Sequence, residues 1–269
     1  MRHRTISAVA LASLAALALP AAAQAAPADT ASLSVLHGVP DTTVDVWVNG
    51  ALTIDDFTPG TLAGPLELAP GTYSVAITAA DATDASSPVI GPVDLPLEAG
   101  TSYTAVAHLT EAGTPTATLF TNDTSATPAG QGRLTVRHVA AAPTVDIWAN
   151  GSVAAPGLAP GAEASLVLPA GTIQAAVSAA GSTDPVLGPA DVTISDGTLT
   201  VVYAWGSLEN GTLALATQTV AAGHSAPGGV PTGEVEVVDA TFPAAPVIGL
   251  LAVLGLGVAL LARRARPQR

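Results

Sequence analysis

Two histidine–aspartate pairs, one in each half of the chain, are the residues whose types and spacing could do chemistry. His37 precedes Asp45, and His138 precedes Asp146 at the same spacing. Such a pair could relay a proton or bind a metal, but a metal site usually needs three or four protein ligands and no further cluster is evident. We prefer the alternative that each histidine donates a hydrogen bond to its aspartate and braces the loop between them. We therefore expect no catalytic residue, no metal site and no cofactor.

Other catalytic signatures are missing from the sequence or too common to be informative. The chain has no cysteine and no Gly-x-Ser-x-Gly motif, which excludes thiolate chemistry, disulfides and a nucleophile elbow. Glycosidase-type carboxylate pairs are easily found among 21 acidic residues, but nothing indicates one. Asp55 and Asp56, or residues 81–84, could contact Ca²⁺, although no Asp-x-Asp-x-Asp-Gly loop is present. A hydrolase is therefore the remotest of the functions considered.

Each aspartate belongs to a predicted strand that ends in a tight turn. Residues 44–50 read Val-Asp-Val-Trp-Val-Asn-Gly, and residues 145–151 read Val-Asp-Ile-Trp-Ala-Asn-Gly. Side chains alternate along a strand, so the aliphatic residues share one face and the aspartate and tryptophan share the other. Asn-Gly tolerates positive φ at both positions and predicts a β-hairpin. The candidate structural or ligand-binding residues are therefore His37, Asp45, Trp47, Asn49 and Gly50, with His138, Asp146, Trp148, Asn150 and Gly151.

The tryptophans leave two interpretations open. Trp47 and Trp148 lie on the face that the valines do not occupy, and we prefer half-exposed indoles that shield their strands. The alternative is an aromatic surface that stacks on a glycan or a small molecule, to which Trp205 could also contribute. That alternative requires an exposed aromatic side chain beside a groove.

A duplicated plan surrounds these strands. Leu33, Val35 and His37 recur as Leu134, Val136 and His138, and the later turns and apolar positions recur as well. Short alternating segments separated by Gly/Pro turns, without helical periodicity, predict an all-β fold of two tandem antiparallel β-sandwiches, Ig-like or prealbumin-like. The predicted domains are 26–123 and 133–220, joined by a linker at 124–132, and each is expected to fold independently.

The predicted strand at Val89–Leu97 is unusual because Pro92 and Pro96 interrupt it. Proline cannot donate a hydrogen bond to a neighbouring strand, so this segment is expected to form an edge strand or a loop.

Charge is distributed unevenly along the chain. All eight basic residues are arginines, and only Arg133 and Arg137 lie between the termini, where all 21 acidic residues are found. An acidic surface of this kind repels phosphate backbones, which argues against nucleic acid as a partner.

The two ends of the sequence predict its location. Residues 1–25 have the basic start, apolar middle and small-residue cleavage site of a secretory signal peptide. Residues 221–243 resemble a Pro/Gly-rich stalk, residues 244–262 are apolar and uncharged, and residues 263–269 contain four arginines. An uncharged span followed by arginines predicts a single-pass transmembrane helix with a cytoplasmic tail and an extracellular N-terminal region. We prefer this anchor to sortase processing, because Val230-Pro231-Thr232-Gly233 departs from the Leu-Pro-x-Thr-Gly signal.

The motif around the first pair resembles a known family. His37, Pro40 and Asp41, followed by Val44-Asp45-Val46 and Asn49-Gly50, are similar to the pattern of domain of unknown function 4397. The resemblance covers about residues 33–220, although Ala141 and Ala142 replace the proline and aspartate in the second repeat. It implies tandem β-sandwich-like repeats in a secreted or surface-attached bacterial protein, and it implies no activity.

These observations favour a non-catalytic, membrane-anchored bacterial cell-surface protein. Its two modules would serve envelope structure, adhesion or protein interaction. The partners expected are the membrane, through residues 244–262, and a cell-envelope or host surface protein or glycan. The alternative function is a module that binds a glycan or a small ligand through surface tryptophans.

Overall fold

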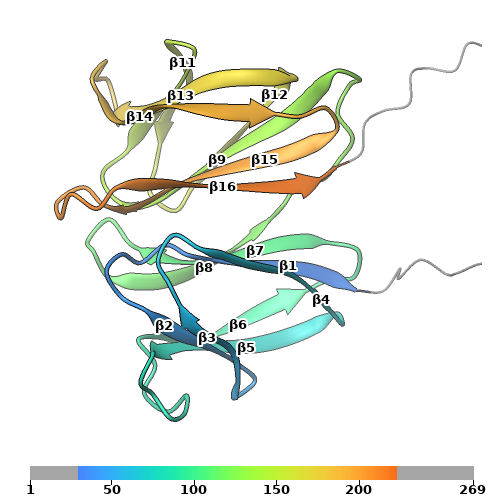
Figure 1. The fold of residues 1–269 in the computed structure, drawn as a ribbon, viewed down its shortest axis with the longest axis vertical. Coiled ribbons are helices and arrows are strands. Elements are labelled where there is room, and N and C mark those ends of the chain that lie inside the picture. Colours follow the sequence, from blue (N-terminus) through green and yellow to red (C-terminus); the bar gives the residue numbers. More distant parts are fainter. Residues whose placement is uncertain (1–29, 223–269) are drawn as a thin grey trace, which may run out of the picture. The chain divides into compact units, whose positions relative to one another are not determined.

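The computed structural model describes residues 30–222, and all regular secondary structure in this range is β-strand (Figure 1). Within the same range no helix is long and apolar enough to cross a membrane. The predicted signal peptide, membrane helix and basic tail lie outside the described residues, as does the predicted stalk beyond Ala222. The prediction of an all-β fold is confirmed for the described part of the chain.

Eight strands form the first sandwich, here called sandwich 1. They are β1 (Ala31–His37), β2 (Val44–Val48), β3 (Ala51–Phe57), β4 (Leu62–Leu68), β5 (Gly71–Ala79), β6 (Ile90–Leu97), β7 (Ser102–Leu109) and β8 (Pro115–Thr121). One sheet has the order β4-β1-β7-β8 and the other has the order β3-β2-β5-β6. Apolar side chains from both sheets meet in one core, which includes Leu33, Val46, Ile77 and Ala105.

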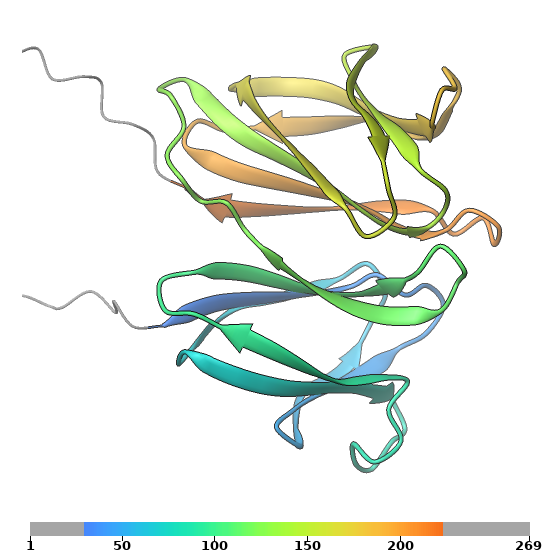
Figure 2. The ribbon, with the colours of Figure 1, turned by 180° about the vertical axis from the view of Figure 1, so that it is seen from behind.

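Sandwich 2 has the same strand order. Its strands are β9 (Gln131–Ala141), β10 (Val145–Ala149), β11 (Ser152–Leu158), β12 (Glu163–Pro169), β13 (Gly171–Ala179), β14 (Pro185–Ile194), β15 (Thr198–Ser207) and β16 (Ala214–Ala221). The sheets run β12-β9-β15-β16 and β11-β10-β13-β14. Leu134, Ile147, Val177 and Val202 belong to its own core. Figure 2 shows from behind how the chain passes from β8 to β9.

The prediction of purely antiparallel sheets is wrong for one strand pair in each sandwich. β1 pairs with β7 in parallel, and β9 pairs with β15 in parallel. Parallel neighbours require a long connection, and five strands lie between the two members of each pair. The sequence pattern contains no information on this direction, because inward and outward side chains alternate in the same way in both kinds of pair.

The proline-interrupted segment forms β6, at the edge of its sheet. This outcome confirms one of the two alternatives that the sequence left open. An edge strand has one side without a neighbouring strand, so the missing N–H groups of Pro92 and Pro96 need not interrupt a central ladder.

A third apolar cluster joins the two sandwiches. Its side chains come from the outward faces of the β4-β1-β7-β8 and β12-β9-β15-β16 sheets. The buried members are Leu36, Val106, Phe120, Val139, Leu199, Val201, Tyr203 and Ala216. Both faces of β15 are consequently covered, and residues 199–204 of this strand are all buried.

The two ends of the described chain lie close together. Thr30 at its start and Ala221 near its end line the same groove, together with Ser32 and Thr219. Figure 1 shows both ends at the same side of the molecule.

Candidate functional site

The Asn-Gly turns have the backbone that the sequence predicted. Asn49 and Gly50 have φ values of 50° and 78°, and Asn150 and Gly151 have values of 49° and 77°. Each asparagine side chain also accepts a hydrogen bond from the neighbouring strand, from the N–H of Ser74 in the first repeat at 3.0 Å. The turn residues therefore close the hairpin and fix it to the sheet.

The two aspartates are buried and bind backbone amides. Asp45 is 2% exposed, and its Oδ1 accepts the N–H of Asp56 at 3.0 Å. Asp146 is 8% exposed, and its two oxygens accept the N–H groups of Gly157 and Gly181, each at 2.8 Å. Amide donors stabilise the ionised form, so they hold the pKa of the Asp146 carboxyl below its usual value.

A β-bulge brings the amides to these carboxylates. The register between β2 and β3 shifts between Val44 and Val46, and the register between β10 and β11 shifts between Val145 and Ile147. The aspartate lies at this shift in both repeats. A bulge can redirect a backbone group away from the ladder. The structural role predicted for the aspartates therefore agrees with their contacts, but their donors are backbone amides and the prediction of histidine donors is wrong.

The histidines brace the loop in a different way. His37 and His138 are fully buried, and their Nε2 atoms lie 2.7 Å from the carbonyl oxygen of Thr42 and 2.9 Å from that of Pro143. The Nε2–H must donate in both cases, because a carbonyl can only accept. Burial lowers the pKa of both imidazoles, so they are neutral and hold the loop that follows β1 or β9.

Buried neutral histidines make the stability of the fold depend on pH. Burial lowers the pKa of His108 as well as those of His37 and His138. The unfolded chain binds protons at these residues near pH 6.5, whereas the folded chain binds them only at lower pH. We expect a constant melting temperature above about pH 7 and a progressive fall as the pH drops from about 6.5 to 5. Thermal unfolding followed by circular dichroism at constant ionic strength measures this decline.

One substitution provides the control for the histidine effect. His138→Gln keeps a side-chain N–H for the Pro143 carbonyl but does not titrate, so the variant should show a shallower decline. A melting temperature that is the same at pH 8 and pH 5 would contradict the prediction.

Replacing Asp146 by alanine should lower the melting temperature by several degrees, because two amide N–H groups lose their acceptor. Asp45→Ala is the matched variant, and it should have the smaller effect because Asp45 accepts one such bond. Calorimetry of the two variants compares them directly. Equal melting temperatures for Asp146→Ala and the unmodified protein would show that the carboxylate does not brace the fold.

The two tryptophans differ in exposure. Each indole N–H donates to a hydroxyl on the adjacent strand, Trp47 to Thr78 at 2.9 Å and Trp148 to Ser178 at 2.8 Å. Trp47 is buried, which differs from the predicted half-exposed indole, whereas Trp148 is half-buried. The loop beside Trp148, residues 180–184, is shorter than the corresponding loop 80–89 of sandwich 1.

A shallow groove lies beside Trp148. Its volume is about 290 Å³, and the polar side chains of Gln174 and Thr183 contribute to its lining. The remaining lining residues are small or are prolines, namely Gly151, Ala176, Pro185 and Pro189. Trp148 of the second repeat therefore lies beside a groove.

Three carboxylates of sandwich 1 form an acidic group. One oxygen from each of Asp45, Asp55 and Asp56 lies within 4.8 Å of the others, and oxygens of this kind are ligands for Ca²⁺. Two of the three residues are exposed. Sandwich 2 has Pro156 and Gly157 at the positions of Asp55 and Asp56, so this group is not part of the repeated motif.

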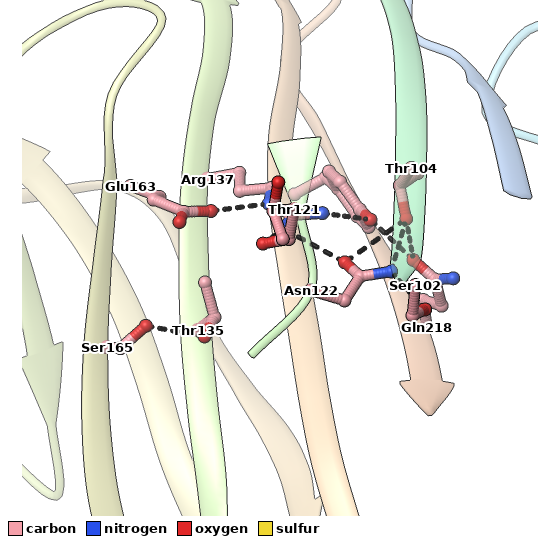
Figure 3. A network of polar contacts seen from close by, with 10 residues as sticks. Ser102, Thr104, Thr121, Asn122, Thr135, Arg137, Glu163, Ser165 and Gln218 are labelled. Atoms are coloured by element: carbon pink, nitrogen blue, oxygen red, sulfur yellow. Dashed lines mark hydrogen bonds and ion pairs between the residues drawn. The ribbon is translucent and has the colours of Figure 1, made fainter. Parts of the chain in front are cut away.

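The sequence interpretation missed the role of Arg137, which lies between the sandwiches and is 1% exposed (Figure 3). Its guanidinium donates to Glu163 at 2.8 Å, and to the Tyr203 hydroxyl and the Asn122 side-chain oxygen at 3.0 Å each. Its Cζ also lies 4.4 Å from the centre of the Phe120 ring. One cation therefore bridges β8, β9, β12 and β15.

Further contacts continue this bridge. Thr104 of β7 donates to the side-chain oxygen of Gln218 on β16 at 3.0 Å. The Trp205 ring packs against Gly60, where an added Cβ would lie 2.6 Å from the ring. Trp205 is therefore an interface residue and does not form the exposed aromatic platform that a glycan would need.

Comparison with known proteins supports the predicted family. Residues 31–148 match the family model described as domain of unknown function, DUF4397. No curated protein matches the sequence. Among solved structures, the Bacillus anthracis TIE protein is similar over 72% of this chain and 44% of its own, with 14% identity and a TM-score of 0.19. The chain thus spans less than half the length of that protein. The match over residues 31–148 confirms the resemblance to this family that the His37 to Gly50 motif predicted.

Proposed function

We propose that this protein is a non-catalytic bacterial cell-surface protein that presents two rigidly joined β-sandwiches for envelope structure, adhesion or protein interaction. The main support for the proposal is that the polar groups of the repeated motif form hydrogen bonds within the fold. Asp146 binds two backbone amides, His138 binds a carbonyl, and Trp148 binds Ser178. These groups stabilise the fold, which leaves little of the repeated motif free to act on a substrate.

The proposed location is the outer face of the cell membrane. It is supported by the signal-peptide pattern of residues 1–25, and by the uncharged residues 244–262 that precede the terminal arginines. The extensive contact between the sandwiches suits a display role, because a stiff body holds its exposed loops at fixed positions. In this proposal the sandwiches are of the Ig-like or prealbumin-like type.

Protease protection tests the location. Wall-stripped but intact cells would carry the full chain with an epitope tag after Arg269, and proteinase K would be added from outside. We expect loss of the sandwiches and survival of a short tagged fragment. Permeabilised cells are the control and should lose the tag as well. Protection of residues 30–222 in intact cells would overturn the proposed topology.

A second candidate function rests on the groove beside Trp148. A half-buried indole next to a polar side chain suits a sugar ring, which offers an apolar face and hydroxyl groups. A glycan array probed with residues 30–222 would test this candidate, with Trp148→Ala and Trp47→Ala as matched variants. Glycan binding that only the Trp148 variant loses would support it, whereas no binding, or equal loss in both variants, would exclude this groove.

A further inference from the structure

A pocket of about 220 Å³ lies between the two sheets of sandwich 1. All eight strands contribute to its lining, and Thr53 is the one lining residue with a polar side chain. An apolar cavity of about 150 Å³ in another protein stays dry and binds benzene or xenon. The pocket in sandwich 1 is larger, and it therefore has room for an apolar guest and no charged group to bind a polar one.

The shape of the pocket favours a linear guest. Its lining extends from Ile54 on β3 and Leu66 on β4, across the central strands, to Val93 on β6 and Ala117 on β8. Neighbouring strands are about 4.8 Å apart, so four strands span roughly 14 Å. A pocket that extends over this width between two facing sheets accommodates a chain better than a compact ring system.

The lining of the pocket is least buried beside β3 and β4. Thr53 is exposed, while Ile54 and Leu66 are half-buried. A guest could therefore enter at this edge of sandwich 1 and leave a polar end near the Thr53 hydroxyl.

The pocket in sandwich 1 is present because several side chains of β7 and β8 that line it are small. Ala107 pairs with Ala117, and at the equivalent positions of sandwich 2 Ala204 pairs with Leu215. Ala105 of β7 pairs with Val35, where sandwich 2 pairs Val202 with Val136. Two positions that are alanine in sandwich 1 are thus filled by valine and leucine in sandwich 2.

We propose that sandwich 1 binds a single hydrocarbon chain, such as that of a fatty acid or a lipid, in this pocket. The chain lies between the sheets with its polar end in solvent beside β3. The inference goes beyond the proposed function and does not depend on it, because it concerns the interior of one sandwich.

The test uses residues 30–222 with ¹³C-labelled Ile, Leu and Val methyl groups, titrated with decanoate below the concentration at which it forms micelles. We expect saturable shifts of methyl groups that line the pocket, such as those of Ile77 and Leu95. The double variant Ala105→Val/Ala117→Leu should bind at least tenfold more weakly. Ala112→Leu, at an exposed turn residue, is the matched control and should bind like the unmodified protein.

Several outcomes distinguish the possibilities. No saturable shift, shifts confined to sandwich 2, or equal affinity in the double variant would each overturn the proposal. If the double variant does not fold, xenon dissolved under pressure should shift the methyl groups of Ile77 and Leu95 in the unmodified protein, and the absence of such shifts would overturn it. A second titration, with phosphatidylglycerol vesicles in place of decanoate, identifies the source of the hydrocarbon chain. Shifts with vesicles support the chain of a lipid, and shifts with decanoate alone support a free fatty acid.

Discussion

Replacing Arg137 by methionine should lower the free energy of unfolding by about 3 kcal/mol, because it removes a buried cation from its partners. Tyr203 and Asn122 would each lose a charged donor, and the contact with the Phe120 ring would be lost as well. Loss of the ion pair with Glu163 contributes less to the destabilisation, since the Glu163 side chain is 37% exposed and can be hydrated. For a unit of this size the loss corresponds to a fall of about 6 to 12 °C in melting temperature.

Arg133→Met is the matched control for this prediction. Arg133 forms an ion pair with Asp123 at 3.0 Å, but the Asp123 side chain is 54% exposed. Exposed pairs contribute about 1 kcal/mol or less. Scanning calorimetry of both variants should therefore show a much larger loss for Arg137→Met, and equal losses would mean that the buried network does not hold the sandwiches together.

Producing one sandwich without the other should lower its stability, because the apolar face that contacts the other sandwich is then exposed to water. Residues 131–222 contain a complete core, so the fragment should keep a β-type circular dichroism spectrum and unfold cooperatively. It should melt at a lower temperature than the whole unit and self-associate, because Val139, Leu199 and Val201 become exposed. Analytical ultracentrifugation and thermal unfolding measure the two effects.

The variant Val201→Asp makes this prediction sharper. In the whole unit Val201 is fully buried, and an unpaired carboxylate there should cost several kcal/mol, on the order of a severe core mutation. In the fragment the same side chain faces water, so the variant should fold normally and associate less. Comparable destabilisation in both contexts would show that the face of β15 is not covered by sandwich 1 in solution.

The hairpins at the centre of each repeat could be predicted from local sequence alone. A tight hairpin turn requires positive φ, which Asn49-Gly50 and Asn150-Gly151 adopt readily. The alternation of apolar residues over 44–48 predicts which face of the strand is buried. The donors to the aspartates could not be predicted in this way. Gly157 reaches Asp146 only because a bulge shifts the register, and Gly181 belongs to a loop between two later strands.

Two features of the sequence are related to the interface between the sandwiches, although neither was interpreted in that way from the sequence alone. Residues 199–205 read Leu-Thr-Val-Val-Tyr-Ala-Trp, a run without the polar alternation of a half-exposed strand. Such a run is typical of a strand that is buried on both faces. Arg137 was one of two basic residues in an acidic region, but its partner Asn122 comes from the other sandwich, and no local pattern predicts that contact.

The proximity of Thr30 and Ala221 has a consequence for how the double sandwich can be connected to other chains. A unit whose ends lie beside the same groove can be circularly permuted with a short linker, or inserted into a loop of a host protein. Loop 80–89 offers a place for new ends, since it lies between β5 and β6 and most of its residues are exposed. The sandwiches therefore form a module whose covalent order can change while their packing is preserved.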